Sequence, residues 1–429
     1  MRADVVVVGA GPAGLATAAR LAEAGRKVRI IARGNGFTHW GAGSVDVLAR
    51  AGGRRLERPG DGIGELPPRH PYRLLGAAPL RSGLEWFQRT AASFGLDQIG
   101  DPDVNRPQVS GLGTLRTTCL LPAPAAGELG GQVAVIGFAG FRDFSPALCA
   151  AGLERRAMRE GFDGARITTG TVELPEWSHQ RYFTAIELAQ AIDDETFRAK
   201  LAPGIARCAA GAGVAIVPAV LGLRSGHEAW ADLERRTGLR LVEAALPPPS
   251  VPGLRLFNAY RQRLTGLGAR WQFGFPAIAV EALGGRISTV RCEGASREIT
   301  VECEDLVLAT GGVAGHGIEA KRDGSMVEVV AGLPVAGMPD RRGFVGERFL
   351  GEHPVAAAGV QVDTELRPVD GSGAAIYTNL RCVGGLLSDH DPTSEGSREG
   401  VGLASASRVA ELLAPATTSA AAGNGGTAR

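Results

Sequence analysis

Apolar positions open the chain in a pattern that predicts a strand, a tight turn, a helix and a second strand. Val5–Val8 form an unbroken apolar run, typical of a strand buried in a parallel sheet. A helix is predicted over Leu15–Ala24, which is rich in Ala and Leu and is followed by Gly25, a residue favoured just beyond a helix C-terminus. Lys27–Ala32 returns as a β-branched strand, so the chain begins with a β-α-β unit.

The later apolar segments predict further strands and helices, followed by a β-meander and a last helix. Helices are expected at Leu84–Phe94, Pro146–Glu160, Thr184–Leu201, His227–Arg236, Leu254–Leu267 and Val401–Leu413. Strands are expected at Gly130–Phe138, Arg166–Val172 and Val214–Val220, and the meander at Trp271–Ala282, Ile287–Cys292 and Glu298–Cys303. Prolines and glycines between Arg50 and Gly83 predict an ordered loop, and the Ala-, Thr- and Gly-rich residues 414–429 predict a disordered tail.

Composition excludes several classes of function. The 429 residues carry 46 Lys and Arg against 45 Asp and Glu, a balance that gives no basic stripe for nucleic acid or anionic lipid. The six cysteines form no Cys-x-x-Cys pair, so we expect no zinc ribbon, iron–sulfur cluster or disulfide framework, and no metal site. No apolar run reaches the ~18–20 residues that span a bilayer, and we therefore expect a cytoplasmic protein.

Three glycines in the first turn, Gly9, Gly11 and Gly14, have the spacing of a dinucleotide-binding turn. Gly9 permits the tight turn, Gly11 leaves room for a phosphate beside the backbone, and Gly14 allows the helix to pack closely on the strand. The free N–H groups and the positive dipole end of the helix attract that phosphate. The predicted strand before the turn and the helix after it make a coincidental spacing the weaker explanation.

The acidic residue expected at the end of the second strand is missing, because Ala32 and Arg33 stand there. In dinucleotide sites a carboxylate at this position binds the adenosine ribose, which NAD and FAD both contain. Two explanations stay open on the residues alone. Either Arg33 binds the 2′-phosphate of NADP, or no adenosine is bound and the ligand is a mononucleotide.

Further glycine-rich segments follow in the order that flavoproteins show. Gly43 and Ser44 lie in a loop after the second strand that is placed to contact an isoalloxazine ring, or else form an ordinary turn capped by Ser44. Gly311 and Gly312 end a buried strand expected to return beneath the cofactor. The segment expected to hold the ribityl phosphate contains Gly384, Gly385, Asp391, Glu395, Gly400 and Gly402. Asp391 and Glu395 either hydrogen-bond the ribityl chain or cap a turn.

Together these elements predict an α/β fold, a discontinuous doubly wound Rossmann-like flavin-binding domain with an inserted α+β cap domain. We expect the flavin-binding domain to comprise residues 1–74 and 253–413, and the cap or substrate domain to comprise residues 75–252. The ligand site is expected between the two domains, where pockets preferentially form.

The chain resembles the B-type subunit family of anaerobic glycerol-3-phosphate dehydrogenases over nearly its whole length. The most specific stretches are Thr38–Leu48 (THWGAGSVDVL) and Asp391–Gly396 (DPTSEG), and His70–Tyr72, Pro247–Gly253 and Gly359–Asp363 add to the likeness. The resemblance implies oxidation of sn-glycerol 3-phosphate to dihydroxyacetone phosphate, with electrons passed to quinone. FMN, the cofactor that it implies, agrees with the missing ribose-binding acid.

The same resemblance implies two partners, a larger flavin-containing catalytic subunit and an iron–sulfur membrane anchor subunit. We therefore expect the chain at the inner face of the membrane, held there through these partners. The absence of Cys-x-x-Cys pairs agrees with iron–sulfur clusters that reside on another subunit.

Oxidation of a secondary alcohol by a flavin requires a base for the hydroxyl proton and cations for the substrate phosphate. The candidate bases are His39, His70 and His353. The candidate phosphate ligands are Arg142, Arg381 and Arg398. For each of these side chains the alternative is a structural or solvated role.

Three other functions remain as alternatives. The first is an electron-relay flavoprotein without its own substrate site, and the second is an NADP-linked oxidoreductase that uses Arg33. The third is a flavin-like fold that serves only as a scaffold. The loop Thr38–Asp46 and the last glycine segment argue against NADP, which needs neither, and the intact glycines argue against a scaffold.

Overall fold

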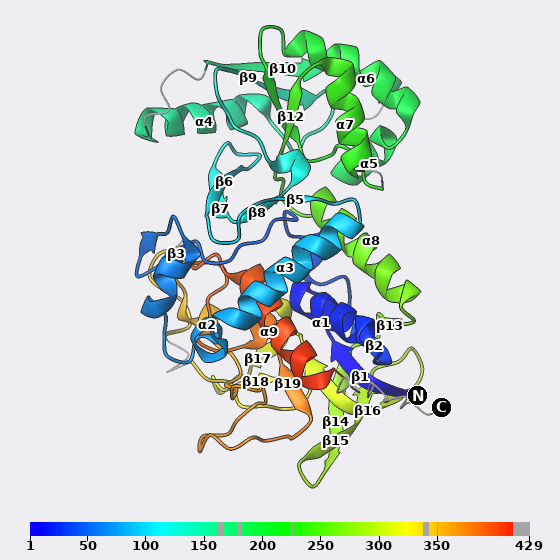
Figure 1. The fold of residues 1–429 in the computed structure, drawn as a ribbon, viewed down its shortest axis with the longest axis vertical. Helices are drawn as coiled ribbons and strands as arrows, with labels where there is room; N and C mark the ends of the chain where they lie inside the picture. The colour runs from blue at the N-terminus through cyan, green and yellow to red at the C-terminus, as the bar shows by residue number, and fades with distance from the viewer. Residues whose placement is uncertain (161–165, 178–181, 225, 338–342, 350, 415–429) are drawn as a thin grey trace, which may run out of the picture.

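The computed structural model describes residues 1–160, 166–177, 182–224, 226–337, 343–349 and 351–414. Two large hydrophobic cores organise these residues. The first contains the buried apolar residues of the N-terminal unit and most of those after residue 256, and it forms the lower body in Figure 1. The second lies between residues 109 and 251 and forms the upper lobe.

A parallel sheet forms the centre of the lower body. β1 (Arg2–Val8) lies between β2 (Val28–Ala32) and β16 (Ile299–Leu308) and pairs in parallel with both. β13 (Arg270–Phe273) extends the sheet beyond β2, and β19 (Leu380–Cys382) pairs in parallel with the last residues of β16, Leu306–Leu308. The ends of the central strands are apolar and buried, over Val5–Val8 of β1 and Leu306–Leu308 of β16, as the run of valines in β1 predicts for a sheet covered by helices.

The first part of β16 carries an antiparallel ribbon. β14 (Ala277–Leu283) pairs with β15 (Arg286–Cys292), which pairs in turn with β16. The expected first meander strand, Trp271–Ala282, is wrong as a single element. Gly274 has φ +77° in the interruption between β13 and β14, a backbone conformation that suits glycine. β13 therefore joins β2 in parallel and leaves the meander.

Helices pack on the lower sheet and on one another. α1 lies against α8 and α9, and α3 lies against α9. α3 begins before the predicted start at Leu84, because Pro79 falls in the first helical turn, where its missing N–H costs no intrahelical bond. These helices are α1 (Pro12–Glu23), α2 (Pro71–Leu75), α3 (Ala77–Ser93), α8 (Val251–Gly266) and α9 (Arg398–Leu413).

The upper lobe contains a second sheet in the order β10-β9-β11-β12, with every pairing parallel. Its strands are β9 (Gln132–Phe138), β10 (Arg166–Val172), β11 (Val214–Pro218) and β12 (Arg240–Ala244). The helices of the lobe are α4 (Pro146–Glu160), α5 (Ala185–Ile192), α6 (Glu195–Cys208) and α7 (Gly226–Thr237). The larger part of the inserted region is therefore an alternating α/β layer, accompanied by small antiparallel pairs.

The predicted single helix Thr184–Leu201 is wrong in one respect, because it is divided into α5 and α6. Thr184 and Glu187 form a capping box at the start of α5. Asp194 caps the start of α6 by accepting a hydrogen bond of 2.9 Å from the N–H of Phe197. A capping acid in the middle of an amphipathic stretch starts a new helix rather than continuing the old one.

Short antiparallel pairs accompany the two main sheets. They are β3 (Arg50–Ala51) with β4 (Arg54–Arg55), β5 (Gln98–Gly100) with β8 (Leu120–Pro122), β6 (Arg106–Val109) with β7 (Leu115–Thr118), and β17 (Ile318–Ala320) with β18 (Met326–Glu328). The apolar face of α3 belongs to the first core. We therefore propose that the insertion begins after α3 rather than at residue 75.

A buried ion pair ties the upper lobe to α8. The guanidinium of Arg255 donates two hydrogen bonds of 2.8 Å to the carboxylate of Glu243 on β12. Its Nε donates a third, of 2.6 Å, to the carbonyl oxygen of Gly222.

No helix in the described part of the chain is long and apolar enough to cross a bilayer. The expected tail lies outside the described residues from position 415 onward.

Candidate functional site

The first glycine turn joins β1 to α1, and its three glycines have different surroundings. A Cβ on Gly9 would lie 2.2 Å from the carbonyl oxygen of Ala309, and one on Gly14 would lie 2.2 Å from the carbonyl oxygen of Gly9. A Cβ on Gly11 would have only the backbone nitrogen of Phe37 nearby, at 3.9 Å. Gly9 and Gly14 therefore allow backbones to pack, whereas Gly11 borders open space.

The later glycine segments come together at the first turn of α1. A Cβ on Gly312 would lie 2.8 Å from the carbonyl oxygen of Gly385, so these two turns face each other. Gly384 has φ +65°, and a Cβ there would lie 2.6 Å from Cβ of Ala13. A Cβ on Gly402 would lie 3.4 Å from the backbone nitrogen of Ala13. Three segments distant in the sequence thus surround one helix N-terminus.

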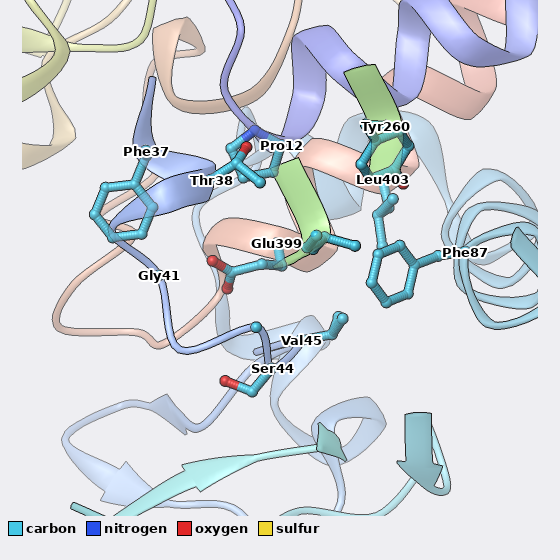
Figure 2. A pocket seen from close by; sticks show the side chains of 12 residues that line it. Pro12, Phe37, Thr38, Gly41, Ser44, Val45, Phe87, Tyr260, Glu399 and Leu403 are labelled. Carbon is cyan, nitrogen blue, oxygen red and sulfur yellow. The ribbon is translucent and has the colours of Figure 1, made fainter. Parts of the chain in front are cut away.

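A pocket adjoins this N-terminus (Figure 2), with an open volume of about 440 Å³ that includes solvent at its mouth. Its wall is formed by apolar side chains from α1, α3, α8 and α9 together with the segment 37–45 and Glu399. Gly43 is held between Pro122 and Pro252, with 3.1 Å from its Cβ position to each ring. The pocket is lined by Pro12, Phe37, Thr38, Gly41, Gly43, Ser44, Val45, Phe87, Leu256, Tyr260, Glu399 and Leu403.

Glu399 is the acidic side chain of the pocket and lies in the first turn of α9. It accepts a hydrogen bond of 3.4 Å from the N–H of Asp46. Burial in the pocket, and then the charge of Asp46, raise the pKa of Glu399 to about 7, against the opposite effects of Arg398 and Arg116. Arg116 forms an ion pair with Asp46 and donates a hydrogen bond of 2.7 Å to Oγ of Ser44.

Comparisons with known proteins agree with this geometry. A family model described as an FAD binding domain matches residues 4–401. The B-type subunit of anaerobic glycerol-3-phosphate dehydrogenase from Vibrio cholerae is 31% identical to the chain, over 96% of this chain and 97% of that protein. The chain belongs to this B-type subunit family. The same subunit of Yersinia pseudotuberculosis is 32% identical, over 96% of this chain and 98% of that protein.

One solved structure with a distant likeness to this chain is that of a steroid dehydrogenase. The 3-ketosteroid Δ1-dehydrogenase of Sterolibacterium denitrificans aligns with a TM-score of 0.45 and 11% identity, over 96% of this chain and 99% of that one. At this similarity we draw nothing about function from it. Membership of the family establishes the Rossmann-like flavin domain and a flavin-dependent oxidoreductase class for the chain.

The residues present fit a flavin. The N-terminus of α1 begins at Gly11 with no side-chain cap and no acidic residue in its first turn, which leaves its amides and positive dipole available to a phosphate. The hydroxyl of Thr310, in the second glycine turn, is buried without a hydrogen-bond partner among the described residues. A buried polar group of this kind requires a partner, and a cofactor bound beside the second glycine turn would be one.

His70 lies away from open space, because its side chain is fully buried. It is the N-cap of α2, where Nδ1 accepts a hydrogen bond of 3.1 Å from the N–H of Tyr72. Nε2 therefore carries the proton and donates to Glu395 at 3.1 Å. Nδ1 thus caps α2 and Nε2 joins α2 to the segment before α9, which favours a structural role.

The other two candidate histidines differ in which of their ring nitrogens form hydrogen bonds. His39 ends the short helix next to the pocket, and its Nδ1 donates a hydrogen bond of 2.7 Å to the carbonyl oxygen of Gly36. That bond leaves Nε2 unprotonated in the neutral ring. Nδ1 of His353 accepts from the N–H of Gly346 at 3.0 Å, and Nε2 donates to the carbonyl oxygen of Phe349 at 3.0 Å.

The remaining predicted residues have mixed positions. The carboxylate of Asp391 accepts from the N–H groups of Thr393 and Ser394, which is the turn-capping arrangement. Gly400 leaves room for Tyr72, whose hydroxyl would lie 2.1 Å from a Cβ there. These two residues thus have packing roles that do not require a ligand.

The three candidate arginines also lie in different surroundings. Arg142 is exposed on the upper lobe. Arg381 is buried near Asp305, with a separation of 3.9 Å. The guanidinium of Arg398 lies 3.8 Å from the centre of the Phe37 ring, at the edge of the pocket. Of the three, Arg398 is the one next to the pocket.

Sequence reasoning missed the acidic and basic side chains around Ser44. Glu399 stands one position before the predicted Gly400, and Asp46 belongs to the Thr38–Leu48 stretch. Arg116 reaches them from β7, within the inserted region. The signal for Glu399 was an acidic residue among the glycines at the start of a helix, whereas nothing local connects Arg116 to this loop.

Proposed function

We propose that the chain is the FMN-binding subunit of a respiratory glycerol-3-phosphate dehydrogenase. In this role it takes part in oxidising sn-glycerol 3-phosphate to dihydroxyacetone phosphate, with electrons passed to quinone. The name of its curated relatives supports the substrate and the subunit character. The proposed partners are a larger flavin-containing catalytic subunit and an iron–sulfur subunit, which hold the chain at the cytoplasmic face of the membrane.

The observation that carries the choice of FMN is the end of β2. Ala32 is buried there and the next residue, Arg33, is exposed. Binding of FAD at this fold uses a carboxylate at that position for the adenosine ribose, whereas FMN ends at the ribityl phosphate and needs none. The uncapped N-terminus of α1 and the room beside Gly11 suit a single phosphate.

The chain's own residues suggest a division of labour at the pocket. A bound flavin supplies the acceptor for hydride from the substrate carbon. His39 is the candidate base, because Nδ1 is held by Gly36 and Nε2 is left to take a hydroxyl proton. The apolar side chains of Phe87, Tyr260 and Leu403 exclude water from the inner part of the pocket.

A second candidate function is electron relay without substrate oxidation on this chain. The residues that line the described pocket include Glu399 but neither Arg nor Lys. A substrate phosphate dianion is normally bound by such cations, so this lining is poorly suited to glycerol 3-phosphate. In this alternative the larger partner oxidises the substrate and the FMN of this chain passes the electrons on.

The experiment that separates the two functions adds sn-glycerol 3-phosphate anaerobically and follows the visible flavin absorbance. The FMN-loaded chain is tested alone and in complex with its partners, with the opposite enantiomer of the substrate as control. Bleaching of the isolated chain supports substrate oxidation here, whereas bleaching only in the complex supports relay. A chain that takes up no flavin, or a complex whose FMN is never reduced, contradicts both.

A further inference from the structure

The pocket places one carboxyl group among apolar side chains. Glu399 projects from the first turn of α9 toward the middle of the pocket, between the segment of Phe37 and Gly41 and the side chain of Ser44 (Figure 2). Val45 and Leu403 are among the apolar groups of the wall. A carboxylate loses hydration in such a place, and this loss favours its neutral form.

A second carboxyl group lies beside the first, and the two have opposite surroundings. Asp46 is paired with the guanidinium of Arg116, which stabilises its negative charge. Its other oxygen, Oδ1, is buried without a hydrogen-bond partner among the described residues. Two neighbouring carboxylates repel each other, so the proton is held by Glu399, the group that has no ion-pair partner among the described residues.

The other titratable groups near Glu399 leave this division unchanged. Arg398, on the same helix, stacks on the ring of Phe37. Burial raises the pKa of Tyr72 on α2 well above its usual value, so this phenol stays neutral. Glu395 is bound by His70 and by the hydroxyl of Ser397, which donates to it at 2.8 Å.

We propose that Glu399 remains a neutral carboxyl group in the flavin complex and donates a hydrogen bond to the flavin, while Asp46 keeps the negative charge. The inference rests on the proposed function, because it requires a flavin in this pocket. The carbonyl oxygens and the unprotonated ring nitrogens of the oxidised isoalloxazine accept hydrogen bonds and repel a carboxylate, whereas its N3–H donates, so the proposal places Glu399 at an accepting atom. Glu399 thus contacts the flavin directly and couples flavin binding to proton uptake.

A pKa of about 7 for Glu399 before binding fixes the direction of the pH effect. About nine tenths of the carboxyl is protonated at pH 6 and about one tenth at pH 8. Since the complex requires the protonated form, each FMN that binds is accompanied by uptake of a small fraction of a proton at pH 6 and of nearly one proton at pH 8. The affinity for FMN is therefore expected to fall about tenfold between these two pH values.

The test compares FMN affinity at pH 6 and pH 8 for the full chain and for Glu399→Gln, which keeps the shape and the donor but cannot ionise. At pH 6 the two are expected to bind equally, and at pH 8 the variant is expected to bind about tenfold more tightly. Titration of the FMN phosphate affects both proteins alike and cancels in this ratio. Glu411→Gln, a more exposed position late in the same helix, is the matched control and should follow the unmodified chain.

Calorimetry of FMN binding to the unmodified chain in two buffers of different ionisation enthalpy gives a second readout, which holds even if the variant folds poorly. The inference predicts nearly one proton taken up per FMN at pH 8. It is overturned by FMN binding without proton uptake, by equal pH dependence in Glu399→Gln, or by a variant that binds more weakly at both pH values. Absence of FMN binding in every protein would instead refute the proposed function.

Discussion

At the scale of single residues, His70 shows how a motif histidine can be fully occupied by structure. It donates to Glu395, which also accepts from Ser397, and Ser397 in turn accepts a hydrogen bond of 2.9 Å from Nε2 of His390. Burial lowers the pKa of His390 to about 4, so this second histidine stays neutral. The network therefore holds the segment before α9 in place, because its polar groups form hydrogen bonds with one another.

Replacement of His70 by Ala should destabilise the fold rather than stop the chemistry. The buried N-cap and the partner of Glu395 are both lost, with an expected cost of about 2–3 kcal/mol in the free energy of unfolding. Thermal unfolding measures this cost, and turnover of the FMN-loaded complex per folded chain should persist.

In contrast, His39→Ala should keep the melting temperature and lower substrate oxidation about 100-fold or more. A reversed pattern would make His70 the base.

Asp46→Asn tests the partition of charge between the two pocket carboxyls. Its negative charge raises the pKa of Glu399, and after substitution Arg116 and Arg398 face that carboxyl without Asp46. The pKa of Glu399 should then fall by about one unit. The weakening of FMN binding should consequently begin about one unit lower in pH, which a series of titrations from pH 5 to 9 measures (a range chosen to bracket the pKa of about 7). An unchanged midpoint would contradict the pairing.

At the scale of elements, the turn between β1 and α1 separates structure from binding. Gly14 is required for packing, because its Cβ position lies 2.2 Å from a backbone oxygen. Gly11 has ordinary extended backbone angles, φ −75° and ψ 179°, and space at its Cβ position. A side chain at Gly11 would therefore enter only the space proposed for the phosphate.

Gly11→Ala and Gly14→Ala form a matched pair of variants for this turn. Gly11→Ala should unfold within a few degrees of the unmodified chain and lose most of its FMN affinity, by about 100-fold. Gly14→Ala should lower the melting temperature strongly, since backbone must move to accommodate the methyl group. Differential scanning calorimetry and flavin fluorescence provide the two readouts. Tight FMN binding by Gly11→Ala would show that the phosphate does not bind at this turn.

The first β-α-β unit could be predicted from sequence because its signals are local, an apolar run followed by glycines and an Ala-rich segment. The division between α5 and α6 was also local, but the capping residue Asp194 was outweighed by the continuous amphipathic pattern around it. The position of β13 beside β2 could not be found in this way. Its partner lies far away in the chain, and pattern alone does not choose between parallel and antiparallel neighbours.

At the scale of the whole molecule, the ion pair of Arg255 and Glu243 holds the upper lobe against α8. Both side chains are almost completely buried, so neither charge is compensated by water. The removal of one partner leaves the other charge buried and unpaired, which costs about 3–5 kcal/mol. Because α8 also lines the pocket through Leu256 and Tyr260, this contact connects the position of the lobe to the site.

Glu243→Gln should therefore lower the free energy of unfolding by about 3–5 kcal/mol. The double variant Glu243→Leu with Arg255→Leu should recover a large part of that loss, since no unpaired charge remains. Urea unfolding of both variants measures the difference. If Glu243→Gln unfolded in urea like the unmodified chain, the ion pair would not stabilise the interface between the two cores.

The pocket itself was only partly predictable, because it assembles five distant segments. The spacing of the glycines indicates their roles, which explains why the sequence predicts the turns. The pairing of Asp46 with Arg116 depends on β7 of the inserted region reaching the loop after β2. No local pattern encodes that approach, and the acidic side chain of the pocket, Glu399, gains its significance only from the neighbours that the fold provides.

The central claim is that the chain binds FMN rather than FAD, in a site without an adenosine-binding acid at Ala32. Mass spectrometry of the flavin released by denaturing the purified chain tests it most directly. The account predicts FMN at close to one molecule per chain. Release of FAD would contradict the argument from the end of β2 and would favour a dinucleotide site of the usual kind.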